Sequence, residues 1–388
     1  MEKLIYMDNA ATTSTAPEVV SAMLPFFTEY YGNPSSVYNF AQKSKMAIED
    51  AREIIADSIG AAKSNEIYFT GGGSESDNWA LKSAAFGLRD KGNHIITTKI
   101  EHHAILNTCA YLEKNGFEVT YLDVDSEGFV SLEDVENAIT EKTILISVMF
   151  ANNEIGTIEP VCEIGEIAHK HGILFHTDAV QAMCHVPINV TEMNIDLLSA
   201  SAHKFHGPKG VGFMYMKNSA KLEPFIHGGA QERARRAGTS NVPGIVGMGQ
   251  AVKLALSTLD KDTHTIINMR NYIVDRILGE IPDVTFDGPC IDANAVSAGS
   301  PAGSLKRLPS NMHFCFKDVS GDSLLIMLDM NGICASSGSA CAAGSIDPSH
   351  VLLAIGRSKG ETKGALRLSI DKDLTKEDAD YAIDALKA

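Results

Sequence analysis

The sequence predicts an α/β protein whose main domain is a mostly parallel sheet flanked by helices. Short apolar runs alternate with amphipathic stretches over the first two thirds of the chain, and strand followed by helix at this spacing is typical of a parallel sheet covered on both faces. The 388 residues exceed one ordinary core, so we expect a second, smaller α+β domain. A hydrophobic fraction of 44% with 21% charged residues is typical of a soluble globular protein.

The charge of the chain argues against two classes of partner. Asp and Glu number 49 against 33 Lys and Arg, a formal net charge of -16, so we expect neither nucleic acid nor an anionic membrane as a partner. No apolar run approaches the roughly 18 residues of a membrane span. Asp8 interrupts the N-terminus before a signal-peptide core could form. The sequence therefore predicts a cytoplasmic protein.

The large domain is predicted to contain seven short strands with helices between them. A helix of mixed charge over 41–58 comes first, and further helices begin near Ser74 and Ala104. Polar motifs follow several of the strands, and parallel sheets bind ligands beyond the carboxyl ends of their strands. The predicted strands span residues 67–70, 95–98, 119–122, 144–149, 173–176, 195–198 and 211–216.

The last third of the chain is predicted to form the smaller domain. Two helices, 243–259 and 264–281, would cross into it, and the segment 288–309, rich in Ala, Ser, Gly and Pro, is typical of a long surface loop. Then we expect a strand, a helix, a loop, a strand and a terminal helix, the first four at 312–316, 320–332, 336–349 and 366–370. The expected domains are an N-terminal segment (1–14) that packs with the small domain, the large domain (15–255) and the small domain (256–388), which carries a mobile loop around Cys341.

Lys204 is the main candidate for a reactive amine. It lies on a Gly- and Pro-containing bend, 199–210, between two predicted buried strands, where desolvation lowers the pKa of an ammonium group and frees the amine as a nucleophile. Two serines and two histidines of the first eight residues of this bend offer hydrogen bonds to an anion such as a phosphate. The alternative is a solvated lysine, the usual state of this residue type.

A Schiff-base lysine needs an anion cradle and an acid for the ring nitrogen of its cofactor. Gly73 and Ser74 end a glycine run that leads into a helix N-terminus, a favourable place for a phosphate. The alternative is an ordinary helix start with Ser74 as its cap. Asp178 follows the strand at 173–176, and a buried carboxylate that faces a pyridine nitrogen keeps the ring protonated. A cap or turn residue is the alternative for Asp178.

The third requirement is a flat residue for the face of the ring. His102 follows the strand at 95–98, and an imidazole there could stack on a ring or transfer protons near neutral pH. The alternative is a structural or surface histidine. We expect no metal site built from His102, His103, His203 and His206, because no carboxylates at ligand spacing accompany them.

The cysteine pattern predicts a reactive thiol. The seven cysteines are odd in number and contain no C-x-x-C pair, which argues against a disulfide framework and a zinc ribbon. Cys341 lies among small residues in the loop 336–349, where a thiol is exposed and free to move. The rival, Cys334, has the apolar neighbours of a buried strand. Arg367, on the strand at 366–370, could clamp a carboxylate.

Together these motifs resemble those of the cysteine desulfurases of the NifS/IscS type. This group is a branch of the class V aminotransferase family, with pyridoxal 5'-phosphate as cofactor and the type I aminotransferase fold. The resemblance covers essentially the whole chain. Its motifs, in order, are DNAATT (8–13), GNPSS (32–36), EHH (101–103), NNEIG (152–156), DAVQ (178–181), SAHK (201–204), RAGT (236–239) and SGSAC (337–341).

The resemblance implies a role for each matching residue. Lys204 would form the Schiff base, Asp178 would pair with the ring nitrogen, and His102 would stack on the ring. Lys204 and His102 would also carry protons, and Cys341 would be the nucleophile. The remaining implied contacts are the ring oxygen (Gln181), the phosphate (Gly73, Ser74, Ser201, His203 and, from a partner subunit, Thr239), and the substrate carboxylate (Asn153, Arg367 and Asn33, with Asn153 also touching the cofactor).

The implied reaction converts L-cysteine to L-alanine and leaves a persulfide on Cys341. A homodimer is implied by Thr239, and the acceptor of the sulfur would be an iron–sulfur scaffold protein or a tRNA-thiolation enzyme. A selenocysteine lyase, another aminotransferase-type enzyme and a non-catalytic sulfur-transfer scaffold are the alternatives. Three features depart from the family pattern: Ser74 replaces the commoner threonine, Tyr38 replaces a histidine, and the 288–309 loop is longer than typical.

Overall fold

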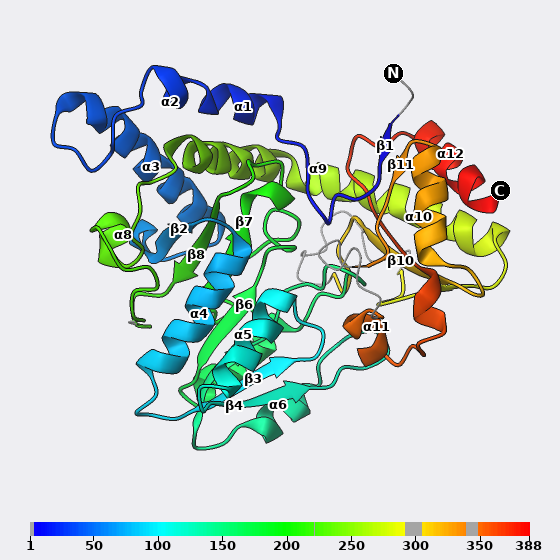
Figure 1. The fold of residues 1–388 in the computed structure, drawn as a ribbon, viewed down its shortest axis with the longest axis horizontal. Coiled ribbons are helices and arrows are strands. Elements are labelled where there is room, and N and C mark those ends of the chain that lie inside the picture. Colours follow the sequence, from blue (N-terminus) through cyan, green and yellow to red (C-terminus); the bar gives the residue numbers. More distant parts are fainter. Residues whose placement is uncertain (1–3, 221, 292–304, 339–347) are drawn as a thin grey trace.

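The computed structural model describes residues 4–220, 222–291, 305–338 and 348–388. Its centre is a seven-stranded sheet in the order β2-β8-β7-β6-β5-β3-β4, visible on the left of Figure 1. All neighbouring strands are parallel except β8, which runs antiparallel to both β2 and β7. The predicted mostly parallel sheet is therefore confirmed. Its strands are β2 (Ile67–Thr70), β3 (His94–Thr98), β4 (Glu118–Leu122), β5 (Thr143–Ser147), β6 (Leu174–Asp178), β7 (Leu197–Ser201) and β8 (Gly212–Met216).

Helices cover both faces of this sheet, because most of its strands are buried along their whole length. One face packs against α4 (Gly73–Gly87) and α5 (His103–Glu113), whose buried side chains include Trp79 and Leu112. The other face packs against α3 (Asn39–Ser58), α7 (Val161–Lys170) and the first part of α9 (Val242–Glu280). Four shorter helices complete this part of the molecule: α1 (Pro17–Met23), α2 (Pro25–Thr28), α6 (Leu132–Ala138) and α8 (Gln231–Ala234).

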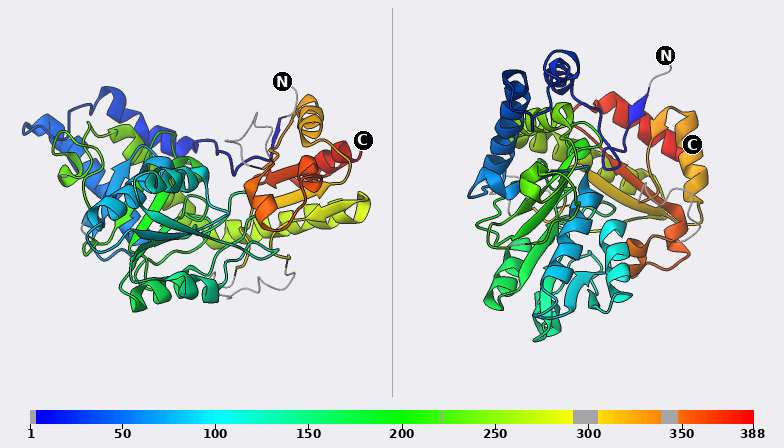
Figure 2. Two further views of the ribbon diagram at one scale, coloured as in Figure 1. Left: turned by 60° about the horizontal axis from the view of Figure 1, so that its bottom comes forward. Right: turned by 60° about the vertical axis from the view of Figure 1, so that its left-hand side comes forward.

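The remaining elements form a smaller body beside the large sheet. Figure 2 shows the larger and the smaller body, with α9 extending from one into the other. Its three-stranded sheet has the order β12-β10-β9, antiparallel throughout. The N-terminal strand β1 pairs in parallel with β11 of this body. The elements are β1 (Ile5–Tyr6), β9 (Val284–Phe286), β10 (Asn311–Phe316), α10 (Gly321–Met330), β11 (Ile333–Cys334), α11 (His350–Ala354), β12 (Ala365–Ser369) and α12 (Lys376–Lys387).

The prediction of two separate helices at the crossover into the small body is wrong. The two helices expected over 243–259 and 264–281 are a single helix, α9, of 39 residues. It packs against α1 and α3 at one end and against α12 and β9 at the other. By length and composition α9 is also the one helix among the described residues that could cross a membrane, but its buried side chains belong to the cores of both bodies, as in the core helix of a globular protein.

Two strand boundaries differ from the prediction in a way that matters for the site. The runs expected to end at residues 176 and 198 continue as β6 to Asp178 and as β7 to Ser201. These last residues are polar yet buried, with 5% of Asp178 and 4% of Ser201 exposed. The sheet therefore carries polar side chains to its carboxyl edge before any loop begins.

Candidate active site

Lys204 lies at the carboxyl edge of the large sheet, as the last residue of a short 3-10 turn (Ala202–Lys204) between β7 and β8. Its Nζ donates hydrogen bonds to the main-chain oxygens of Ala10 (2.6 Å) and Ala11 (2.8 Å). The amine is thus oriented by a chain segment almost two hundred residues away in the sequence. No feature of the sequence pattern indicated that the N-terminal turn would supply these acceptors.

Other hydrogen bonds fix the N-terminal segment over the lysine. Thr13 donates both its main-chain N–H and its hydroxyl to the carbonyl oxygen of His203. Gln181 donates from Nε2 to the same Ala10 oxygen that receives Lys204, at 3.0 Å. His185 bonds the carbonyl oxygen of Lys204 itself, at 3.0 Å. The lysine is therefore held on both its side-chain and its main-chain side.

Asp178 is the acid that the sequence pattern assigned to the ring nitrogen of a cofactor, and the structure brings it close enough to Lys204 for their charges to interact. Its Oδ1 accepts the N–H of Val180 at 2.9 Å. Burial raises the pKa of Asp178, while the charges of His102 and Lys204 lower it. Because these two groups act on the same carboxyl group, Lys204, His102 and Asp178 form one electrostatic unit.

His102 is the N-cap of α5, and its ring orientation follows from that role. Its Nδ1 accepts the N–H of Ala104 at 3.1 Å. Since Nδ1 is an acceptor, the neutral ring carries its proton on Nε2. One ring nitrogen of His102 lies within 4.8 Å of a carboxylate oxygen of Asp178. His103, by contrast, points toward His350, with ring centroids 4.8 Å apart.

The start of α4 forms an anion cradle beside Ser201. Gly72 is the N-cap residue and no side chain among the described residues caps this helix, so its first N–H groups are available to a ligand. A Cβ on Gly73 would come within 2.6 Å of Val180 and 3.8 Å of the Ser201 Cβ. Only glycine fits this approach, and Ser74 lies exposed at the same helix start. These residues have the chemistry and the space expected of a phosphate site.

Two further predicted phosphate ligands are His203, in the turn that ends at Lys204, and Thr239, in the segment before α9. His203 is hydrogen-bonded through Nδ1 to Thr12 at 3.1 Å, and burial, with Lys204 and Lys209 nearby, lowers its pKa to about 4. The neutral ring can therefore donate one hydrogen bond to a phosphate without adding a positive charge beside Lys204. Thr239 is exposed and lines a cavity of about 190 Å³ together with Thr70 and Gly71.

Arg367 and Asn153 meet at a buried point of contact. Only 1% of the Arg367 side chain is exposed, its Nη1 donates to the Asn153 carbonyl oxygen (3.1 Å), and its Nη2 pairs with Asp8 (2.8 Å). Its Nε has no hydrogen-bond partner among the described residues. A guanidinium group with a spare buried donor can receive a carboxylate. Asp8 is a further site residue that the sequence reasoning gave no role.

Two of the predicted site residues are not placed in this group. Asn33 is exposed on the loop between α2 and α3, where its Oδ1 accepts the N–H of Ser35, and no described contact joins it to Lys204 or Arg367. Cys341 lies outside the described residues. The rival cysteine, Cys334, is in β11 as the sequence predicted, and burial raises the pKa of its thiol.

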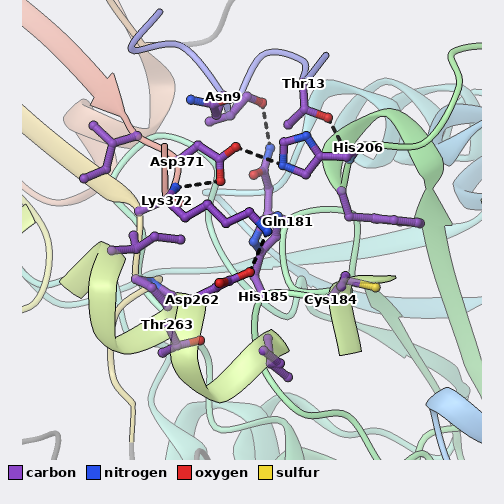
Figure 3. Close-up of a pocket in the computed structure, with 18 residues that line it drawn as sticks. Asn9, Thr13, Gln181, Cys184, His185, His206, Asp262, Thr263, Asp371 and Lys372 are labelled. Atoms are coloured by element: carbon purple, nitrogen blue, oxygen red, sulfur yellow. Dashed lines mark hydrogen bonds and ion pairs between the residues drawn. The ribbon is translucent and has the colours of Figure 1, made fainter. Parts of the chain in front are cut away.

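A cavity of about 70 Å³ lies behind the lysine, between the two bodies of the molecule. Figure 3 shows Gln181 and Asn9 on its upper wall and two ion pairs across it. His206 pairs with Asp371 at 3.1 Å, and Lys372 pairs with Asp262 at 2.7 Å. The His206–Asp371 pair thus joins the large body to the small one, and the Lys372–Asp262 pair joins the small body to α9 at the same cavity.

Comparisons with known proteins agree with this geometry. The family model described as aminotransferase class-V matches residues 5–382. The chain belongs to the class-V aminotransferase family. Within the family it is 55% identical over 386 residues to the cysteine desulfurase IscS of Clostridium botulinum, covering 100% of this chain and 94% of that one. It is 52% identical over 384 residues to the cysteine desulfurase IscS of Methanosarcina thermophila, covering 99% and 91%.

Solved structures of the family share the fold. A NifS-like protein superposes with a TM-score of 0.90 at 36% identity, covering 99% of this chain and 98% of its own. A structure described as SspA in complex with cysteine gives a TM-score of 0.79 at 39% identity, covering 95% and 99%. The type I aminotransferase fold expected from the motifs is therefore confirmed.

Proposed function

We propose that the protein is a pyridoxal 5'-phosphate-dependent cysteine desulfurase, which converts L-cysteine to L-alanine and retains the sulfur. The observation that carries the proposal is the grouping of Lys204, Asp178 and His102 beside the start of α4. An amine, a buried acid, an imidazole and an anion cradle are the parts that this cofactor needs. Full-length relatives at 52–55% identity are named cysteine desulfurases, which selects this activity among those of the family.

Pyridoxal phosphate supplies an aldehyde carbon for covalent attachment and a ring that accepts electrons when a bond at the neighbouring carbon breaks. Lys204 is the amine that would hold it, oriented by the carbonyl oxygens of Ala10 and Ala11. Asp178 provides the buried negative charge for the ring nitrogen. His102 has Nδ1 committed to Ala104, so Nε2 is the nitrogen that could exchange a proton. The phosphate and ring-oxygen contacts would come from Gly73, Ser74, Ser201, His203 and Gln181.

The substrate carboxylate would be received by Arg367 with Asn153 beside it. The buried guanidinium already shares its charge with Asp8, so its geometry is fixed before the substrate arrives. A preformed cation lowers the entropic cost of orienting the amino acid. This would place the α-carbon of cysteine within the region of Lys204 and His102.

Cys341 would take the sulfur. Its thiolate attacks the sulfur atom of the bound cysteine, so a sulfur–sulfur bond forms as the carbon–sulfur bond breaks. The electron pair of the broken bond stays with the carbon skeleton, which is protonated to alanine. One thiol and one cysteine give one persulfide and one alanine, so the step needs no external oxidant or reductant. A transaminase on the same fold would not need this thiol.

The proposal extends to partners and location. A second copy of the chain would complete the phosphate site through Thr239, which is exposed here. The sulfur would pass to an acceptor protein, such as an iron–sulfur scaffold or a tRNA-thiolation enzyme. The enzyme would work in the cytoplasm.

The test is incubation of the purified protein with L-cysteine and a thiol reductant, with alanine and sulfide measured together. We expect both products from the wild type and neither from Cys341→Ser, while Cys334→Ser serves as the matched control and keeps both. Alanine without sulfide, or equal rates in the Cys341→Ser protein, would contradict the role of Cys341. Lys204→Ala should lose covalent cofactor attachment, seen as loss of the bound cofactor's visible absorbance.

A further inference from the structure

A second buried acid, Asp77, lies beside Asp178, and none of the site motifs includes it. It is on the second turn of α4, on the face that packs against the large sheet, and only 1% of it is exposed. One carboxylate oxygen each of Asp77 and Asp178 and one nitrogen of His102 all lie within 4.8 Å of one another. Its Oδ1 has no hydrogen-bond partner among the described residues. An unpaired buried carboxylate next to another carboxylate is electrostatically unfavourable unless one of them is protonated.

The groups around Asp77 cannot neutralise it. His176 Nε2 is 3.8 Å from Asp77 Oδ1, but full burial lowers the pKa of His176 to about 3, so the ring is neutral. The other acid facing this space, Glu101, is also completely buried, and burial raises its own pKa well above the ordinary carboxyl value, so it offers Asp77 no compensating charge. The Lys204 ammonium and the His102 ring act on Asp178 instead.

A chain of hydroxyl and imidazole groups lies next to Asp77 and could accept a hydrogen bond from a protonated Asp77 carboxyl group. The Ser199 hydroxyl is near enough to Asp77 to lower the pKa of its carboxyl group, Ser199 Oγ is 3.0 Å from His176 Nε2, and His176 Nδ1 is 2.9 Å from Ser147 Oγ. If Asp77 carries a proton, it can donate to Ser199, which donates to Nε2, while Nδ1–H donates to Ser147. Both ring nitrogens of His176 and the Ser199 hydroxyl are then satisfied, and Asp77 carries no buried charge.

The two carboxyl groups have unequal surroundings. Burial raises the pKa of Asp178 as well, but Asp178 accepts a main-chain N–H from Val180 and lies near the Lys204 ammonium and the His102 ring. Asp77 has a hydroxyl group as its stabilising contact, and burial together with the charge of Asp178 raises its pKa well above the ordinary value. When two neighbouring acids share one negative charge, the charge resides on the better-stabilised one.

We propose that Asp77 is a positioning residue that keeps its own proton, so that Asp178 is the single buried anion facing the ring of the cofactor. This inference rests on the proposed function, because it specifies how the acid of that site is kept in its working charge state. Asp77 acts through Asp178 and through the chain of Ser199, His176 and Ser147, which runs beneath the sheet edge.

Infrared difference spectroscopy of the full-length protein, with and without bound cofactor, tests the protonation state directly. At neutral pH we expect the wild type minus Asp77→Asn spectrum to show the C=O stretch of a protonated carboxyl group. Asp134→Asn, an exposed acid at the start of α6, is the matched control and should show an ionised carboxylate instead. A difference spectrum of Asp77→Asn that shows an ionised carboxylate would overturn the proposal.

A second variant tests the coupling and does not depend on the folding of Asp77→Asn. In Asp178→Asn the neighbouring negative charge is gone, so the protonated-carboxyl band of Asp77 should disappear at a pH at least one unit lower than in the wild type, a tenfold change in the acid dissociation constant. An unchanged titration would show that the two groups are independent and would refute the proposal.

Unfolding of the cofactor-free protein gives a further readout. An acid that stays protonated in the folded state but ionises on unfolding makes the unfolding constant rise about tenfold per pH unit, starting above the ordinary carboxyl pKa near 4. In Asp77→Asn the logarithm of the unfolding constant should rise less steeply with pH than in the wild type, by one unit per pH unit. Asp134→Asn should leave the slope unchanged. An equal slope in wild type and Asp77→Asn would contradict the inference. None of these measurements uses the substrate L-cysteine, so failure of this inference can be told apart from failure of the proposed desulfurase activity.

Discussion

The reactive groups of this protein owe their orientation to their immediate neighbours more than to their own sequence motifs. Lys204 is directed by two main-chain oxygens, and His102 is directed by its role as a helix cap. Arg367 is held by Asp8 and by the main chain at Asn153. In each case hydrogen bonds to described residues fix the side chain before a ligand binds, which is the preorganisation that binding sites need.

Arg367 provides the first prediction at this scale. In Arg367→Lys the charge remains, but the planar donor set that contacts Asp8 and Asn153 is lost. Loss of charge-assisted hydrogen bonds worth about 1.5 to 3 kcal/mol should raise the KM for cysteine about 10- to 100-fold, with a smaller effect on kcat. Steady-state kinetics of alanine formation measure this. Arg276→Lys, a surface ion pair on α9, is the control, and an unchanged KM in Arg367→Lys would remove the residue from substrate binding.

At the scale of elements, the sequence predicted all seven strands of the large sheet but not where the polar ends of two of them lie. Apolar runs identify strands well, because most of the sheet is buried on both faces. Asp178 and Ser201 were expected in loops, yet they are strand residues whose polar groups are satisfied by Val180 or face the site. The hydrophobic pattern cannot show this, since functional residues interrupt it.

The single helix α9 shows a second limit of the sequence pattern. The polar residues 260–265 suggested a break, but they lie where the helix passes between the two bodies. There Asp262 faces Lys372 across the cavity, so a polar stretch is compatible with a continuous helix. Tertiary contacts decide whether a polar stretch of this kind continues a helix or breaks it. In the same way, Asp77 and Ser199 became recognisable as partners only once α4 was packed on the sheet.

The contact between β8 and the start of α4 carries a prediction of its own. A Cβ on Gly212 would lie 2.4 Å from the Ala200 carbonyl oxygen and 2.8 Å from the Cα of Gly72. Gly212→Ala should therefore push the cradle away from the sheet, lowering the stability by about 1 to 3 kcal/mol and weakening cofactor binding. Thermal unfolding with and without added pyridoxal phosphate measures both effects. Gly279→Ala on α9, where nothing lies within 4 Å, should not weaken cofactor binding, and an equal response of the two variants would contradict the packing argument.

At the scale of the whole molecule, the site is assembled from segments that are far apart in the sequence. The N-terminal residues pair with the small body through β1 and β11, and then cross over Lys204 to reach α1. The domain division at residue 255 stays a proposal, and it falls inside the continuous helix α9. Figure 3 shows the charged pairs His206–Asp371 and Lys372–Asp262 at the cavity where the large and the small body meet. The geometry at Lys204 therefore depends on how these two bodies are held together.

His206 and Asp371 make that dependence sensitive to pH. His206 bonds the Ser14 carbonyl oxygen through Nδ1 (3.1 Å) and Asp371 through Nε2 (3.1 Å), so both ring nitrogens face acceptors and the ring is held as a cation. The hydrogen bond that His206 donates to Asp371 raises the pKa of His206, while burial and Lys372 lower it. His206 in turn, together with His185, holds the pKa of Asp371 below its usual value.

The sign of the pH effect follows from these shifts. A histidine whose pKa is raised by folding contributes stability that is complete below its unfolded pKa of about 6.5, and that is lost as the pH rises through the higher folded value. The wild type should therefore lose about 1 kcal/mol of stability relative to His206→Gln as the pH rises from about 6 through the folded pKa. Asp371→Asn should abolish the difference, because the imidazolium then has no anion to face. Urea unfolding of the four proteins of this double-mutant cycle across the pH range measures the coupling, and a coupling that persists above the folded pKa of His206 would show that the contact between the two bodies is not an ion pair.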